Sequence, residues 1–161
     1  MNSRHLSILP VLLIFSLLFA CEEKGETPDT KKTPEQIATE SLTGTGTAQW
    51  TVAVGGSVTR DGQNVTSTYA TFEVILNSGT SKAYSTKNGG GLFDDNGNWS
   101  FAGTNFDKII LTGNKPAATR EISFTQTGTT LRLEFRVPAP GARVDGTTSL
   151  SGNYTINLVK K

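Results

Sequence analysis

The feature that most restricts the fold of this chain is an alternation of apolar and polar side chains that begins after Gly44. Its clearest segment, 131–137, reads Leu-Arg-Leu-Glu-Phe-Arg-Val. Successive side chains of a strand point to opposite faces of a sheet, so this period predicts strands with one buried face. Seven segments show the pattern: 50–54, 69–76, 98–101, 108–111, 121–125, 131–137 and 153–158. If residues 80–86 form a further strand, about eight strands are expected.

The segments between these strands favour hairpins. Asn77-Ser78-Gly79, Asn96-Gly97 and Thr127-Gly128 supply the residues that tight hairpin turns require. Nearly every gap is of hairpin length, so we expect an all-β fold, a single antiparallel up-and-down barrel of about eight strands. A β-sandwich is the alternative, but sandwiches usually need connections that cross between two sheets.

A closed barrel must pair its first strand with its last, because open sheet edges invite aggregation. Trp50 lies on the inward phase of the first strand, and the inward phase of the last strand leads to Lys160. We therefore expect residues 48–54 to pair with residues 153–159. Lys160, or Lys161 if the register slips, is then expected to lie across the Trp50 ring, the alternative being a solvated lysine tail.

The candidate binding residues are aromatic side chains on the expected inward phase. In one interpretation they line a pocket for a small apolar ligand, and in the other they fill the interior completely. An eight-stranded barrel lies at the border between these two cases. The same phase places Val54 and Ala70 inside and Arg136 outside. The candidate set is Trp50, Phe72, Trp99, Phe101, Phe124, Phe135 and Tyr154.

The first twenty residues have the character of an export signal. Arg4 and His5 precede an apolar run over 6–19, which is shorter than the roughly 20 residues of a membrane-spanning helix. The run ends in Leu-Phe-Ala-Cys, which resembles the bacterial lipobox, where the cysteine is acylated and becomes the new N-terminus. We expect Cys21 to carry a lipid anchor. The alternative is a plain signal peptide that leaves Cys21 unpaired.

Residues 21–33 are expected to form a flexible tether, and residues 34–161 the folded domain. Glu22 to Thr33 includes no aliphatic or aromatic residue, so this stretch buries nothing and reaches roughly 20 Å as a random coil. Its acidic pair, Glu22-Glu23, resembles the surface-export signal of Bacteroidota lipoproteins, with a solvated linker as the alternative. The sequence Thr-Pro-Glu-Gln at 33–36 predicts a capping box and a short helix over about 34–41.

The composition argues against catalysis and against nucleic acid. The only histidine, His5, lies in the signal, so no Ser-His or Cys-His nucleophile and no His/Cys metal site can be built. Removal of the signal takes Arg4 from 15 basic residues and leaves 14 against 14 acidic ones. This balance does not suit a nucleic acid or an anionic surface as partner. We expect no enzymatic activity, no cofactor, no metal and a monomer.

The acidic residues of the domain have ordinary structural interpretations. Glu73, Glu121 and Glu134 lie on the outward phase of expected strands, where they solvate the sheet rather than form a glycosidase pair. Asp94 and Asp95 precede Asn-Gly-Asn, but the glycine is out of phase with a calcium-binding loop. Turn formation is the favoured interpretation of this segment.

The order of several short motifs over residues 42–161 resembles the small lipocalin-like lipoproteins of Bacteroidota. These motifs are Leu-Thr-Gly at 42–44 before Trp50, the expected strand over 69–77, Asn-Gly-Asn-Trp-Ser-Phe at 96–101, Asp-Lys-Ile-Ile-Leu at 107–111 and Leu-Ser-Gly-Asn-Tyr at 150–154. In true lipocalins a glycine lies two residues before the tryptophan, whereas here Gly46 lies four before it.

The resemblance implies a lipocalin-like barrel with a basic side chain from near the C-terminus over the first-strand tryptophan. It also implies a lipoprotein of the outer membrane, on the periplasmic or the cell-surface face. We expect a non-catalytic binding protein with a small apolar ligand or a protein partner. The alternative is a structural or accessory lipoprotein that acts through protein–protein contacts.

Overall fold

The computed structural model describes residues 31–139 and 150–161. These residues form a helix, a short 3₁₀ helix (η1) and ten strands. Their bounds are α1 Pro34–Thr43, β1 Thr47–Thr51, β2 Ser57–Arg60, β3 Gln63–Asn64, η1 Thr66–Tyr69, β4 Glu73–Asn77, β5 Ala83–Lys87, β6 Asn96–Phe101, β7 Lys108–Leu111, β8 Ile122–Thr127, β9 Thr130–Val137 and β10 Gly152–Lys160.

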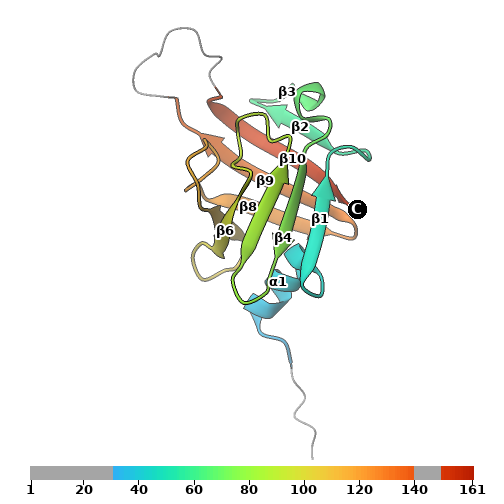
Figure 1. The fold of residues 1–161 in the computed structure, drawn as a ribbon, viewed down its shortest axis with the longest axis vertical. Helices are drawn as coiled ribbons and strands as arrows, with labels where there is room; N and C mark the ends of the chain where they lie inside the picture. Colours follow the sequence, from blue (N-terminus) through green and yellow to red (C-terminus); the bar gives the residue numbers. More distant parts are fainter. Residues whose placement is uncertain (1–30, 140–149) are drawn as a thin grey trace, which may run out of the picture. The chain divides into compact units, whose positions relative to one another are not determined.

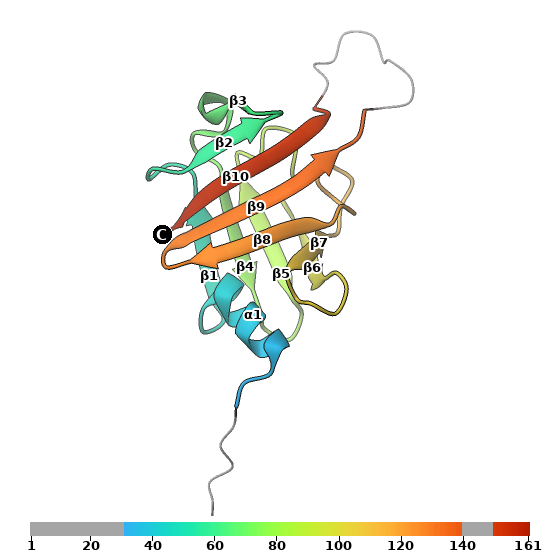
Figure 2. The ribbon, with the colours of Figure 1, turned by 180° about the vertical axis from the view of Figure 1, so that it is seen from behind.

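Eight of these strands close into an antiparallel barrel (Figures 1 and 2). Their order is β1-β4-β5-β6-β7-β8-β9-β10, and β1 pairs again with β10 to close the ring. Trp50 is opposite Lys160 and Thr51 is opposite Val159 in this seam. The predicted meander barrel is confirmed, and the β-sandwich is not formed. The first and last strands pair as predicted, but only at Trp50 and Thr51, because residues 154–157 pair with β2 instead.

The alternation on β9 confirms the predicted register. Its side chains are buried and exposed in turn along the whole strand. Phe135 is 6% exposed, whereas its neighbour Arg136 is fully on the solvent side. On the last strand Tyr154, Ile156 and Leu158 are all buried, as the period predicted.

The assignment of Val54 to the barrel interior was wrong. β1 ends at Thr51, and the chain turns over Val52–Gly56 before β2 resumes the pairing with β10. Gly56 donates its N–H to the Val52 carbonyl at 2.9 Å, and a Cβ at Gly56 would lie 2.5 Å from the Asn157 carbonyl oxygen. Glycine therefore permits a turn that breaks the period and leaves Val54 66% exposed.

The predicted strand over 69–76 was wrong in its first part. Residues 66–69 form η1, and β4 begins at Glu73. Phe72 donates its N–H to the Tyr69 carbonyl at 2.9 Å. Residues three apart share one face of a 3₁₀ turn, so Tyr69 is buried beside Phe72. Phe72 is inside as predicted, whereas Tyr69 and Ala70 have exchanged their predicted faces.

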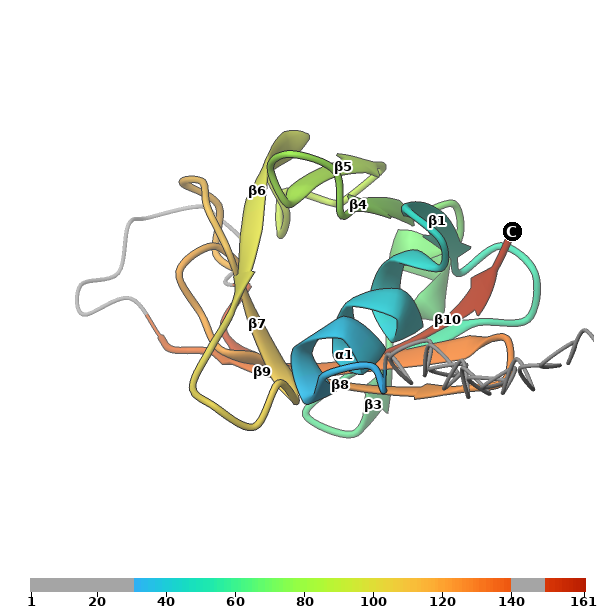
Figure 3. The same cartoon turned by 90° about the horizontal axis from the view of Figure 1, so that it is seen from below.

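Helix α1 covers one end of the barrel, as Figure 3 shows from that side. The predicted capping box is present, with Thr33 and Gln36 exchanging side-chain and backbone hydrogen bonds. The helix runs two residues beyond the predicted 41, so that Leu42 and Thr43 reach buried positions against the barrel. We call this end of the barrel the α1 end and the opposite end, where η1 lies, the Tyr69 end.

Candidate functional site

Aromatic rings pack directly on one another inside the Tyr69 end. Phe72 stacks on Phe93 with ring centroids 4.8 Å apart, and Phe93 meets Phe135 edge-on at 5.7 Å. Phe135 in turn stacks on Tyr154 at 5.3 Å. Three of the predicted lining residues therefore fill this part of the interior, together with Phe93, which the sequence pattern had not placed there.

A pocket of about 140 Å³ lies at the edge of this stack, between β2, η1 and β10. It is less open to solvent than two hollows that lie beside α1 and on the outer face of β7 to β10. Most of its wall is apolar or aromatic. It is lined by Arg60, Val65, Thr68, Tyr69, Leu150 and Tyr154.

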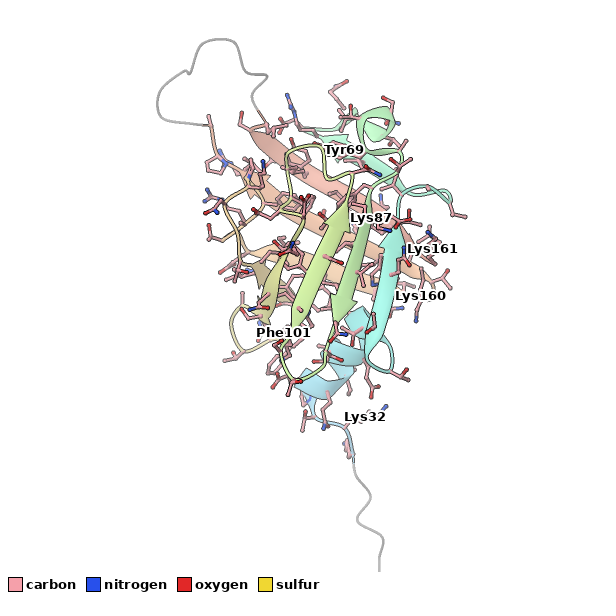
Figure 4. All side chains as sticks on the ribbon, viewed as in Figure 1. Lys32, Tyr69, Lys87, Phe101, Lys160 and Lys161 are labelled. Atoms are coloured by element: carbon pink, nitrogen blue, oxygen red, sulfur yellow. The ribbon has the colours of Figure 1, made fainter. Side chains whose placement is uncertain are left out.

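The two tyrosines of this pocket are held in place by the protein. Tyr154 donates its hydroxyl to the Leu150 carbonyl at 2.9 Å. Tyr69, marked at its end of the barrel in Figure 4, is 3% exposed, and a Cβ at Gly90 would lie 2.7 Å from its ring. Burial, with the charge and hydrogen bond of Tyr154, raises the pKa of Tyr69 to about 12, so Tyr69 stays neutral at physiological pH.

Sequence reasoning found Tyr154 but missed most of this pocket. Val65, Thr68 and Tyr69 belong to η1 or precede it, where no period of two exists. The available signal was the spacing of three between Tyr69 and Phe72, which is the period of a 3₁₀ turn.

At the α1 end, Trp50 joins the barrel to the helix. The ring is 1% exposed, and its Nε1 donates to the Leu42 carbonyl at 2.9 Å. The Lys160 Nζ lies 5.9 Å from the centroid of the Trp50 ring, which is the contact predicted from the register. A Cβ at Gly44, the C-cap of α1, would lie 3.4 Å from this ammonium. A positive charge is favourable at a helix C-terminus.

A second aromatic cluster lies at the α1 end and is only partly covered. Trp99 is buried, and its ring meets Phe101 edge-on at 5.3 Å. Phe101 is marked in Figure 4 and contacts Phe106 at 5.3 Å and Phe124 at 6.3 Å. The Lys82 ammonium lies 5.0 Å from the Phe101 ring. We call the partly exposed residues Phe101, Phe106 and Phe124 the aromatic rim.

Each of the three glutamates predicted to point outward from the sheet forms an ion pair with a basic side chain. The Lys161 Nζ lies 2.8 Å from Glu73, the Lys108 Nζ lies 2.8 Å from Glu121, and Arg132 lies 2.8 Å from Glu134. A hydrogen bond from Lys161, supported by one from Gln49, holds the pKa of Glu73 below its ordinary value. These pairs lie on the sheet exterior, as the sequence phase predicted.

Asp94 organises a turn. Its carboxylate accepts the backbone N–H groups of Asn114 and Lys115 at 3.0 and 2.8 Å. Burial alone would raise the pKa of Asp94, but these hydrogen bonds outweigh it and the pKa lies below the ordinary value. Within 31–139 and 150–161, no three side chains of His, Cys, Asp or Glu form a group that could hold a metal ion.

The predictions for the signal over 1–20, for Cys21 and for most of the tether fall outside the described residues. No helix of the described part is long and apolar enough to cross a membrane. Comparisons with protein-family models, with curated proteins and with solved structures find no match. The likeness to lipocalins therefore rests on the architecture of the barrel.

Proposed function

We propose that this protein is a lipid-anchored, non-catalytic binding protein of the bacterial outer membrane that holds a small apolar ligand. The observation that carries the proposal is the pocket with mainly apolar walls at the Tyr69 end, which is partly open to solvent. Its volume of about 140 Å³ is close to the roughly 150 Å³ of an apolar cavity that accepts benzene. A ligand with a single ring or a short branched chain fits this volume.

The chemistry of the wall supports this class of ligand. Val65, Leu150 and the rings of Tyr69 and Tyr154 supply apolar surface. The Tyr154 hydroxyl already donates to a backbone carbonyl, so the pocket does not depend on a ligand to satisfy that donor. Binding then comes mainly from apolar area removed from water.

Filling the pocket tests the site. We expect indole, toluene or phenol to bind the mature chain in ligand-observed NMR and to be excluded from a Val65→Phe variant. Val54→Phe is the matched control, because Val54 is 66% exposed and does not line the pocket. Equal binding by both variants, or no binding of any probe to the unmodified protein, contradicts the proposed site.

The anchor has its own test. A Cys21→Ser variant is expected to move from the membrane fraction to the soluble periplasm or medium, because the thiol that would carry the acyl chain is absent. A labelled fatty acid should be incorporated by the unmodified protein alone. Unchanged fractionation with no labelling contradicts the lipoprotein assignment and leaves the ligand site unaffected.

A further inference from the structure

The α1 end presents apolar side chains to solvent from two elements. Ile37 on α1 is 58% exposed. It lies five residues before the buried Leu42, which places the two side chains about 140° apart around the helix, so Ile37 faces away from the barrel. Phe106, in the loop between β6 and β7, belongs to the partly exposed aromatic rim.

A chain of side-chain contacts connects these two elements into one surface. Glu35, in the first turn of α1, forms a 2.6 Å ion pair with Lys82. The Lys82 ammonium lies over Phe101, and Phe101 contacts Phe106. Figure 3 looks onto this end and shows α1 beside the loop between β6 and β7.

The backbone of Phe106 is unusual for a bulky residue. Its φ of 55° lies in the left-handed region, which non-glycine side chains seldom adopt. Such conformations persist where the surrounding structure holds them. Here the conformation keeps a phenyl ring at the rim, in contact with Phe101 and partly open to solvent.

The acidic residues of α1 are paired with lysines, so they leave no uncompensated charge that would disfavour contact with an apolar partner. Glu35 is paired with Lys82 and Glu40 with Lys32, each at 2.6 Å. The charges of these two acidic residues are therefore compensated, and Ile37 lies on a helix without an unpaired carboxylate. Exposed aliphatic and aromatic side chains are the groups that insert at the boundary between headgroups and acyl chains.

The short distance in sequence between the expected lipid anchor and α1 indicates that the membrane is the nearby partner. The predicted tether joins the barrel at the start of α1, and Cys21 lies only 12 residues before Thr33. A random coil of this length spans roughly 20 Å. The α1 end is thus the part of the barrel held nearest to the expected anchor. Tethering raises the local concentration to the millimolar range, so even a weak contact is populated.

We infer that the α1 end lies against the bilayer that holds the lipid anchor, with Ile37 and Phe106 in contact with lipid. The inference rests on the anchor of the proposed function but not on the ligand pocket. It orients the Tyr69 end, with its pocket, away from the membrane and toward the aqueous phase.

The test uses the acylated protein in phosphatidylcholine vesicles that contain a lipid quencher placed just below the headgroups. Because the sole native cysteine, Cys21, is acylated, a new cysteine is the only free thiol for a fluorophore. Ile37→Cys is the test position. Val54→Cys is the matched control, since Val54 is equally apolar, 66% exposed and beyond the far end of β1 from α1.

We expect strong lipid quenching of the probe at position 37 and little at position 54, and a Phe106→Ser exchange should reduce the quenching at 37. Equal quenching at both positions, in protein that floats with the vesicles, overturns the docking and leaves the anchor intact. Failure to float overturns the anchor and this inference together. The probe at position 37 could instead become less accessible to solvent as the amount of protein per vesicle rises, with no quenching by lipid. This result identifies a second copy of the chain as the partner and also overturns the docking to the bilayer.

Discussion

Phe135 and Arg136 are neighbours in the chain that occupy opposite sides of the barrel wall. Phe135 contacts Phe93 and Tyr154 in the interior, whereas Arg136 is exposed. We expect Phe135→Ala to lower the free energy of unfolding by about 3–5 kcal/mol, because it removes a ring from a packed core. Arg136→Ala should change it by less than about 0.5 kcal/mol. Urea unfolding measures both, and effects of equal size contradict the observed register.

Two buried tyrosines make the stability depend on alkaline pH. Burial raises the pKa of Tyr69 to about 12, and burial with the Asp94 charge does the same for Tyr84. The Tyr84 hydroxyl also donates to the Thr112 carbonyl at 2.6 Å. In the unfolded chain both titrate near pH 10. The folded state therefore binds more protons between about pH 10 and 12, and its stability is full below this window and falls as the pH rises through it.

The pH prediction is measured by urea unfolding at a pH near 8 and again near 11. We expect Tyr84→Phe to lose less stability between these two conditions than the unmodified protein, because the phenylalanine has no proton to release. An identical loss in both proteins assigns the alkaline sensitivity to other groups.

At the scale of elements, the loop between β5 and β6 and the 3₁₀ helix η1 depend on one glycine. Gly90 has a φ of 58°, and a Cβ there would lie 2.7 Å from the Tyr69 ring. Gly128 has nearly the same φ, 57°, with no atom within 4 Å of such a Cβ. Gly128→Ala therefore reports the backbone cost alone, about 1–2 kcal/mol. We expect Gly90→Ala to cost more and to displace Tyr69.

Comparison of the two glycine variants separates backbone strain from the contact with Tyr69. Thermal unfolding gives the stability difference, and the Tyr69 ring resonances report the displacement. Equal losses of stability in Gly90→Ala and Gly128→Ala would show that the ring moves aside freely, and the pocket wall at Tyr69 would then be less rigid than the structure indicates.

At the scale of the whole molecule, the barrel is closed by a short seam at the C-terminus. Lys161 donates its backbone N–H to the Gln49 carbonyl at 2.9 Å, and its ammonium pairs with Glu73. Figure 4 marks Lys160 and Lys161 beside β1. Lys161→Pro removes the backbone donor and the ion pair, whereas Lys161→Ala removes the ion pair alone.

We expect the proline variant to speed amide hydrogen exchange in β1 and in the last residues of β10, because the seam opens locally. The alanine variant should differ little from the unmodified protein, since the Lys161 side chain is more than half exposed and ion pairs at the surface contribute little. The β8–β9 hairpin, with its own extensive pairing, serves as the internal reference. Unchanged exchange in the proline variant would mean that the other seam contacts suffice.

The sequence by itself determined the architecture of the barrel. Alternation specifies which face of a strand is buried, and the hairpin-sized gaps between segments leave a meander as the simplest connection. The register of the last strand followed from the same period, which placed Lys160 opposite Trp50. The capping box of α1 was equally readable, because it depends on residues three apart in the chain.

Only the tertiary structure decided the ends of the barrel and therefore the candidate site. The turn at Gly56 and the 3₁₀ helix before Phe72 interrupt the period of two, and each turns a side chain to the face opposite to its expected one. Phe93 enters the core from a loop that has no period. Local patterns describe regular strands, but the pocket and the aromatic rim arise where separate loops meet, and that proximity is encoded by packing rather than by spacing along the chain.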